Sequence, residues 1–305
     1  MINKTIILAG GSGFLGQSAA DFFKASGYKI IIFTRGQTIE KNNIQYVNWD
    51  GKTLGNWCDY LENSTALINL TGRSINCIHN EQNKKDIIES RINSVKILNE
   101  AIAQAKNPPS VFIQASSLAI YGNTTELCDE NASHGNDFPS EVCEKWENEF
   151  YKKELPQIRK VIFRIGLILG KNGGALKPLA KLTKLGLGGT IGSGKQFMSW
   201  LHIEDFNRML EFAIENPNIS GNYNVVSSKP ATNQEFMQTL RKVLKMPWSP
   251  PVPEFMVKIG ARFIMKTESN LALGSQNCIP KRFLESGFKI KYTNLTETLS
   301  DLLKK

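Results

Sequence analysis

Residues 5–16 of this chain read TIILAGGSGFLG. The apolar start of the stretch predicts a buried strand at 6–9, because strands of parallel sheets are covered on both faces and lose the alternating pattern. The glycines that follow fit two fingerprints, G-x-G-x-x-G from Gly11 and G-x-x-G-x-x-G from Gly10. Glycines spaced in this way allow a sharp turn, a close approach of the backbone to a pyrophosphate, and tight packing of the next helix on the strand.

The segments after this turn complete a β-α-β unit. A helix is predicted over 17–26, Gly27 is placed to end it, and a second apolar strand is predicted at 30–33. The first N–H groups of that helix would face the phosphates of a dinucleotide. A glycine-rich turn without a ligand is the alternative, but the strand before it and the helix after it favour the dinucleotide.

The residues at the end of the second strand indicate which dinucleotide the chain would bind. An acid about 20 residues past the glycines would bind the ribose hydroxyls of NAD. Here Thr34 and Arg35 stand at that point, and no acid occurs before Glu40. An arginine can pair with a 2′-phosphate through its planar set of donors. We therefore expect NADP rather than NAD, with a solvated surface arginine as the alternative.

Composition and charge limit the class of protein and the partners to be expected. Hydrophobic residues make up 41% and charged residues 21% of the 305 residues, which is typical of a globular protein with a sizeable core. The net charge of +9 comes from scattered lysines, so we expect no nucleic-acid partner. No apolar run approaches the roughly 20 residues that span a bilayer, so no membrane partner is expected.

The dispersed cysteines and histidines predict neither a disulfide framework nor a metal site. Since the first strand begins so near Met1, no secretory segment and a cytoplasmic location are expected.

Further elements follow from periodicity. Strands are predicted at 44–49, 66–70, 111–115, 161–169 and 221–226, and helices at 84–105 and 295–303. The long helix carries two polar positions, Arg91 and Asn93, for which surface exposure is the default explanation. Another helix begins at Thr232 with a capping box to Glu235. The carboxyl ends of the strands should line a crevice, which places Asp50 near an adenine and residues 70–71 near a ribose.

The second half predicts a smaller lobe. An excursion over about 171–200 includes the glycine-rich residues 186–195, which wrap a substrate with Lys195 and Gln196 or else form a flexible linker. Asp205 or Glu204 is expected to cap a helix after 200–203, and His202 to satisfy a local hydrogen bond. Prolines at 247–253 mark a linker, so we divide the chain into 1–245 and 246–305. Beyond the linker an apolar helical stripe is formed by Phe255, Met256, Ile259, Phe263 and Ile264.

Together these segments resemble the extended short-chain dehydrogenase/reductases, the superfamily of sugar-nucleotide epimerases. More narrowly, the chain resembles an "epimerase family" branch that ends in a small domain of unknown function. The matching segments include 10–16, 34–35, 69–72, 90–91, 116–122, 146–147, 164–170 and 223–225, and the most specific is 185–205.

The resemblance implies an α/β fold, a Rossmann-like doubly wound parallel sheet with a smaller, interlaced C-terminal substrate lobe. It implies NADP contacts at Gly10, Ser12, Gly13, Phe14, Leu15, Gly16, Thr34, Arg35, Leu70, Thr71, Gly72, Asp86 and Arg91. It also places Ser117, four residues before Tyr121, where the superfamily keeps its catalytic serine. A hydroxyl there can hydrogen-bond a substrate oxygen beside the nicotinamide, while a polar turn after a strand is the alternative.

The chain departs from the superfamily pattern at the proton donor. Members place Y-x-x-x-K about 25 residues past the serine, and no Y-x-x-x-K occurs in this sequence. One register sets Glu141 four residues before Lys145, and another sets Pro139 before Cys143. Ser117 and Tyr121 are then the nearest candidate donors, with Glu141 a weaker choice. We expect an NADP-dependent oxidoreductase or epimerase with an altered site, acting on a small-molecule substrate; the alternative is a non-catalytic NADP-binding regulatory protein.

Overall fold

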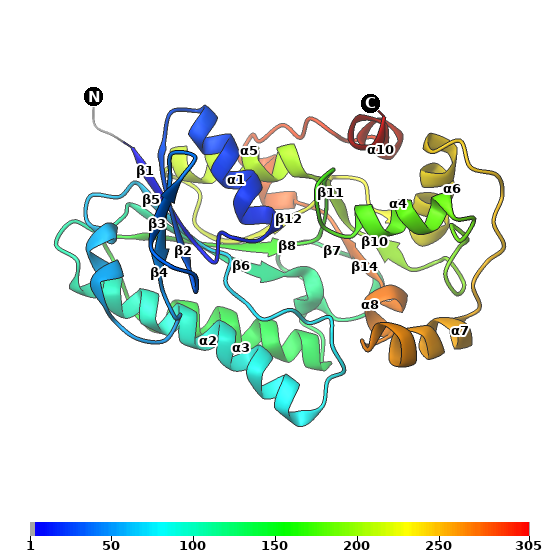
Figure 1. Cartoon of the computed structure of the whole chain (residues 1–305), viewed down its shortest axis with the longest axis horizontal. Coiled ribbons are helices and arrows are strands. Elements are labelled where there is room, and N and C mark those ends of the chain that lie inside the picture. Colours follow the sequence, from blue (N-terminus) through cyan, green and yellow to red (C-terminus); the bar gives the residue numbers. More distant parts are fainter. Residues whose placement is uncertain (1–3, 305) are drawn as a thin grey trace.

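A computed structural model describes residues 4–304. Within that range the side chains at 261, 264, 265, 271 and 272 lie outside the described part, and with them Ile264 of the predicted stripe. The centre of the fold is an eight-stranded sheet in the order β12-β8-β6-β5-β1-β2-β4-β3 (Figure 1). Its strands are β1 (Thr5–Ala9), β2 (Lys29–Thr34), β3 (Ile39–Lys41), β4 (Ile44–Asn48), β5 (Ala66–Asn69), β6 (Val111–Ser117), β8 (Arg159–Ile165) and β12 (Gly221–Val225). All neighbours are parallel except β3, which returns antiparallel to β4.

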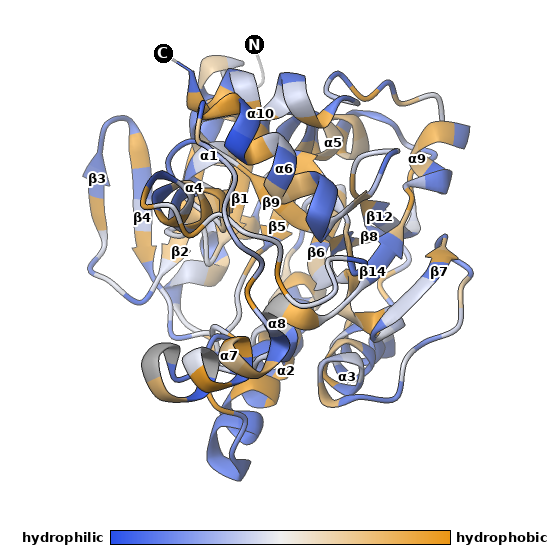
Figure 2. Cartoon of the chain, turned by 90° about the vertical axis from the view of Figure 1, so that its right-hand side faces the viewer, coloured by the Kyte–Doolittle hydropathy of each residue, from blue (hydrophilic) through white to orange (hydrophobic). Residues whose placement is uncertain are grey.

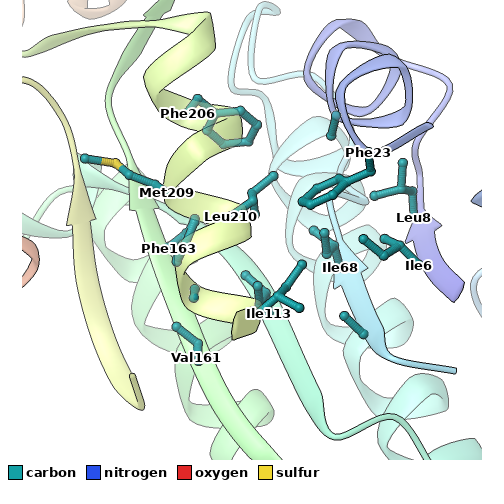
Figure 3. Packing of buried hydrophobic residues seen from close by; sticks show 14 of the residues in the cluster. Ile6, Leu8, Phe23, Ile68, Ile113, Val161, Phe163, Phe206, Met209 and Leu210 are labelled. Carbon is teal, nitrogen blue, oxygen red and sulfur yellow. The ribbon is translucent and has the colours of Figure 1, made fainter. Parts of the chain in front are cut away.

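Helices cover both faces of this sheet. In Figure 1, α1 (Phe14–Ala25) and α5 (Ile203–Glu215) lie above it, and α2 (Glu81–Gln104) and α3 (Phe138–Lys152) lie below it. Alternate residues of β1 therefore enter different cores: Ile6 and Leu8 pack with α1 and α5, as Figure 3 shows, whereas Ile7 and Ala9 pack with α2 and α3. This double burial explains why the first strand is apolar at every position. The predicted doubly wound α/β fold is confirmed.

The predicted strand at 161–169 is wrong in one respect, because the chain breaks it at Gly166. β8 ends at Ile165 in the large sheet, and β9 (Leu167–Leu169) pairs in parallel with β11 (Trp200–His202) in a separate two-stranded sheet. A Cβ on Gly166 would lie 2.5 Å from the Ser199 carbonyl oxygen and 2.6 Å from the Val226 side chain. The close approach of these two segments requires glycine and moves the chain out of the sheet.

The second half builds a smaller lobe beside the sheet. It holds the antiparallel pair β10 (Phe197–Met198) and β13 (Ala231–Thr232), and a core shared by α4 (Leu176–Lys184), α6 (Asn233–Val243) and α10 (Leu295–Leu303). The capping box between Thr232 and Glu235 is confirmed at the start of α6. The expected cap of α5 is wrong, since His202 takes that position: its Nδ1 accepts the Glu204 N–H at 3.0 Å. The local hydrogen bond expected of His202 is thereby confirmed.

The C-terminal segment returns to the main body. It contains α7 (Glu254–Ile259), a π-helical turn η3 (Gly260–Met265), α8 (Asn270–Leu273) and α9 (Lys281–Glu285). Strand β14 (Gln276–Cys278) pairs in parallel with β7 (Thr124–Cys128), and Phe283 of α9 enters the core above the sheet. Two short 3-10 turns, η1 (Asn56–Leu61) and η2 (Leu118–Tyr121), complete the elements. Across residues 4–304, no helix combines the length and the hydropathy that a membrane crossing needs.

Candidate functional site

A cavity of about 850 Å³ opens at the carboxyl ends of β1, β2, β4 and β5. This edge is where parallel α/β sheets bind their ligands. Its walls hold most of the residues predicted to contact a dinucleotide, namely Gly10, Ser12, Gly13, Thr34, Arg35, Leu70, Thr71, Gly72 and Asp86. Phe14, Leu15, Gly16 and Arg91 do not line it.

The glycine turn forms part of the cavity wall. Gly10 has φ +71°, and a Cβ there would lie 2.7 Å from the Thr71 hydroxyl oxygen. A Cβ on Gly16 would lie 2.4 Å from the Gly11 backbone, so glycine lets α1 pack directly on the turn. Around Gly13, in contrast, no described residue beyond its chain neighbours comes within 4 Å of such a Cβ. Two glycines thus shape the turn, and the third leaves space for a ligand.

The start of α1 suits an anion. Its first turn holds no acidic residue, and its N-cap, Gly13, supplies no side-chain hydrogen bond to the first N–H groups. Those donors and the positive end of the helix dipole are therefore left to a ligand. Nearby, the buried Thr71 hydroxyl has no hydrogen-bond partner among the described residues. Phe14 lies to one side of the turn, where its ring fills the space above Gly173.

Arg35 supplies a cation at the end of β2. The residue is exposed and lines the cavity, and the Asn48 amide holds its loop by donating to the Gly36 carbonyl oxygen at 2.8 Å. In the part of the chain that the structure describes, no carboxylate forms an ion pair with Arg35. The nearest acid on the neighbouring strand is Asp50, after β4, which also lines the cavity.

Asp50 is engaged by its own loop. One carboxylate oxygen accepts the N–H groups of Lys52 and Thr53 at 2.8 and 2.9 Å, and the other accepts the Thr53 hydroxyl at 2.8 Å. The Thr53 N–H, together with the other hydrogen bonds, holds the pKa of Asp50 below its ordinary value. The carboxylate therefore stays charged while it braces the loop over the cavity.

Asp86 and Arg91 occupy different places. Asp86, at the cavity wall, forms an ion pair with Arg73, whose other nitrogen donates to Asn83 at 2.8 Å. Arg91 is half-buried, so the default expectation of surface exposure is wrong for it. Its guanidinium donates to the Arg73 carbonyl at 3.0 Å and lies 5.0 Å from the centre of the Trp146 ring. Arg91 thus supports the loop that carries Gly72 and Arg73 from beneath.

Ser117 and Tyr121 have contrasting environments. Ser117 is half-buried at the end of β6, and its hydroxyl accepts one N–H, from Ala119, at 3.2 Å. The hydroxyl of Tyr121 is buried, donates to Asn224 at 2.8 Å and accepts from Arg164 at 2.9 Å. Burial raises the pKa of Tyr121 well above its ordinary value. Ser117 retains capacity for a further hydrogen bond, whereas the hydroxyl of Tyr121 already has two partners.

Helix α3 presents a thiol and a carboxylate to the end of β6, and sequence reasoning missed the carboxylate. Cys143 is buried beside Ser116 and Ser117, and burial, reinforced by the charge of Glu147, raises the pKa of the thiol to about 12. Glu147 is buried too and accepts the Ser116 hydroxyl at 2.7 Å. The spacing of four residues on a helix facing the β6 end could have indicated this pair.

The weaker candidate donor lies elsewhere on α3. Glu141 is exposed and forms an ion pair with Lys145, with 2.5 Å between the carboxylate oxygen and the ammonium nitrogen. These two residues therefore occupy the solvent side of the helix. None of the registers considered for a Y-x-x-x-K equivalent brings a tyrosine to the end of β6.

The glycine-rich segment 186–195 is held in place. The Ile191 N–H donates to the Asn233 side chain at 2.8 Å, and the Gln196 amide donates to the Ile191 carbonyl at 3.0 Å. Gln196 is buried, while Lys195 is exposed. These bonds attach the segment to the start of α6. Such an attachment does not fit a flexible linker.

Comparison with known proteins agrees with this geometry. A model of the NAD dependent epimerase/dehydratase family matches residues 6–226, and a domain of unknown function (DUF1731) matches residues 252–302. The chain is 35% identical to the epimerase family protein YfhF of Bacillus subtilis, over 98% of this chain and 97% of that protein. It is 32% identical to the mouse (Mus musculus) epimerase family protein SDR39U1, over 98% and 99% of the two chains.

Among solved structures, the human epimerase family protein SDR39U1 (isoform 2), crystallised with NADPH, superposes with a TM-score of 0.84. The two chains are 28% identical, and the match covers 98% of each. The likeness extends over both lobes.

Proposed function

The chain belongs to the NAD dependent epimerase/dehydratase family, and on that premise we propose that it binds NADP(H) in the 850 Å³ cavity and acts as an oxidoreductase or epimerase with an atypical proton donor. The proposed substrate is a small molecule, and nucleoside-diphosphate sugars are the first class to examine. The resemblance to sugar-nucleotide epimerases supports that choice.

The observation that carries the cofactor assignment is Arg35 in the cavity wall at the end of β2, where an NAD-binding site would present an acid. Its planar donors match a 2′-phosphate, and Asp50, the acid on the next strand, is engaged with Lys52 and Thr53. The human relative crystallised with NADPH is consistent with the same preference.

The residues of this chain fit such a cofactor by their own geometry. The open space at Gly13 and the uncapped start of α1 would receive the pyrophosphate, while the Thr71 hydroxyl has no hydrogen-bond partner among the described residues. A bound nicotinamide supplies hydride transfer. The chain would contribute orientation through the glycine turn, and a hydrogen bond from the Ser117 hydroxyl to a substrate oxygen.

This chain differs from an ordinary member of the superfamily at the proton donor, because its sequence holds no Y-x-x-x-K. The buried hydroxyl of Tyr121 already has two hydrogen-bond partners, Asn224 and Arg164. The side of α3 toward β6 carries Cys143 and Glu147. This arrangement favours a second candidate, a non-catalytic protein whose partner contacts respond to cofactor occupancy. Turnover distinguishes the two candidates.

Calorimetry with NADPH and NADH tests the cofactor assignment. NADPH should bind more tightly, and Arg35→Ala should remove about 1.5–3 kcal/mol of that preference, roughly 10- to 150-fold. Arg262→Ala, which removes an exposed arginine far along the chain, should leave both affinities unchanged. Equal affinities of the unaltered protein for NADPH and NADH would overturn the assignment.

Mass spectrometry of protein purified without added cofactor addresses the substrate. NADP released on denaturation would support the proposal, and a second small molecule released with it would identify the substrate class. Sugar nucleotides and simple carbonyls, followed at the NADPH absorbance band, then separate the enzyme from the non-catalytic candidate.

A further inference from the structure

Large apolar side chains are exposed along the segment that joins α6 to α8. Trp248 and Phe263 are each 74% exposed, Phe255 is 64% exposed, and Met256 and Ile259 are more than half exposed. Soluble surfaces carry isolated apolar residues, but five large ones within sixteen residues indicate a contact surface. We refer to these five residues as the α7 face.

A second exposed apolar group lies beside the α7 face. Leu182, Leu185 and Leu187 are 44%, 66% and 61% exposed at the end of α4 and in the loop after it. That loop and the segment before α7 are joined by backbone hydrogen bonds, from Gly192 to Val252 at 2.9 Å and from Val252 to Thr190 at 2.8 Å. In Figure 2, α4 and α7 both lie on the side of the molecule that faces the viewer, with α4 above α7.

This surface is strongly basic. Residues 171–195 include no acid and hold five exposed lysines: Lys171, Lys177, Lys181, Lys184 and Lys195. Residues 242–266 hold a single acid, Glu254, and five exposed cations: Lys242, Lys245, Lys258, Arg262 and Lys266. Lys258 pairs with Glu254 at 2.7 Å, and the other nine cations form no ion pair with any described residue.

Charge and apolar area alternate along the helix. Every fourth residue from 255 to 263 is apolar: Phe255, Ile259 and Phe263. Every fourth residue from 258 to 266 is a cation: Lys258, Arg262 and Lys266. The segment is α-helical as far as Ile259 and π-helical from Gly260 to Met265, and within it the cations Lys258 and Arg262 each directly precede an exposed apolar residue. Such a pairing is typical of helices that lie in the plane of a membrane, with aromatic side chains in the acyl boundary and cations at the headgroups.

We propose that the α7 face and the α4 end form a docking surface for an anionic lipid membrane, with the helical segment 254–265 lying along it. Lysines would reach lipid phosphates while Trp248, Phe255 and Phe263 enter the interface. A nucleic acid would use the cations but would leave the aliphatic side chains of Leu185, Leu187 and Ile259 without a partner. This kind of membrane binding needs no apolar run long enough to span a bilayer, since the helix would lie on the membrane rather than cross it.

Flotation of the full-length protein with lipid vesicles tests the proposal. One set of vesicles is phosphatidylcholine alone, and the other contains about one-third phosphatidylglycerol. We expect binding to the anionic vesicles, weakened by added salt, and little binding to the neutral ones. Phe255→Ser with Phe263→Ser should lower the bound fraction at least about tenfold. The matched control, Leu127→Ser with Leu284→Ser, removes exposed leucines elsewhere and should bind as the unaltered protein does.

A charge series completes the experiment. Arg262→Glu with Lys266→Glu should abolish binding to anionic vesicles, whereas Lys96→Glu with Lys106→Glu, exposed on or just after α2, should reduce it only slightly. Circular dichroism of each variant separates a lost surface from a lost fold. Failure of the unaltered protein to bind anionic vesicles would overturn the proposal, as would equal binding by the Phe255/Phe263 variant and its control. A dimer that the same variant dissociates, or retention on DNA without binding to vesicles, would reassign the surface to a second copy or to nucleic acid.

Discussion

Glu147 of α3 and Arg164 of β8 form a buried ion pair beneath the end of β6. The two side chains are 6% and 3% exposed, and a carboxylate oxygen lies 2.8 Å from a guanidinium nitrogen. Burial alone would lower the pKa of Arg164, but the hydrogen bonds and charge of Glu147 raise it above its ordinary value. The pair also accepts the Ser116 hydroxyl and donates to Tyr121, so it fixes the two segments that flank Ser117.

Removing one partner of this pair should destabilise the protein strongly. We expect Glu147→Gln to lower the free energy of unfolding by about 3–5 kcal/mol, because it leaves the Arg164 charge buried without its counter-ion. Glu141→Gln on the same helix breaks an exposed pair with Lys145 and should cost about 0.5 kcal/mol or less. Urea unfolding followed by circular dichroism measures both. A similar loss for the two variants would contradict the stabilising role of the buried pair.

The open space at Gly13 gives a variant that separates binding from folding. Gly13→Val should abolish NADPH binding by filling the cradle, while the melting temperature changes little because, among the described residues beyond its chain neighbours, none has an atom within 4 Å of the new Cβ. Gly260→Val is a matched control, since its Cβ also meets open space and its φ is negative at −61°. The control should bind NADPH normally in calorimetry. Normal binding by Gly13→Val would show that the pyrophosphate lies elsewhere.

The sequence was sufficient for the first β-α-β unit because several signals coincide there. Double burial makes β1 and β2 apolar throughout, and the glycines that shape the turn have no substitute at Gly10 and Gly16. Arg35 could be placed in the cavity for the same reason, since it follows directly on a well-defined strand.

Features that depend on distant contacts could not be predicted. The break at Gly166 arises from Ser199 and Val226, which are far away in the sequence, and the apolar run across it gives no sign of two sheets. Likewise, the burial of Arg91 depends on Trp146, which packs against its guanidinium from another helix. A helical polar position looks the same in sequence whether solvent or a ring covers it.

Ser117 and Tyr121 should respond differently to removal of the hydroxyl. With the best substrate found among sugar nucleotides and carbonyls, Ser117→Ala should lower kcat about 10²- to 10⁴-fold and leave NADPH affinity unchanged. Tyr121→Phe should instead lower the free energy of unfolding by about 1–3 kcal/mol, because Asn224 and Arg164 lose a buried partner. Turnover assays and urea unfolding of both variants check this. Rapid turnover that Ser117→Ala leaves unchanged would refute its role.

Overall turnover of that panel should itself be slow. The hydroxyl of Tyr121 is engaged with Asn224 and Arg164, and the sequence holds no Y-x-x-x-K, so we expect the usual proton transfer to be absent. Robust turnover of a common sugar nucleotide by the unaltered protein would show that another group supplies the proton.

His202 should make stability depend on pH. The ring is buried, its Nδ1 accepts the Glu204 N–H at 3.0 Å, and its Nε2 lies 3.2 Å from the Asp301 carboxylate. These bonds fit the neutral ring with its proton on Nε2, since a proton on Nδ1 would face the Glu204 N–H. Burial accordingly lowers the pKa of His202 below its ordinary value of 6.5, although Asp301 opposes the shift.

The sign of the effect follows from this depressed pKa. Below pH 6.5 the unfolded chain takes up a proton that the folded chain resists, so stability present above that pH is lost as the pH falls toward the folded pKa. The loss is at most about 1.4 kcal/mol per pH unit within that window. His202→Asn keeps an N-cap acceptor for α5 and removes the titrating ring. Urea unfolding between about pH 7 and pH 5 should therefore show a steeper decline for the unaltered protein than for His202→Asn. Parallel declines would mean that His202 is protonated in the folded state as readily as in the unfolded one.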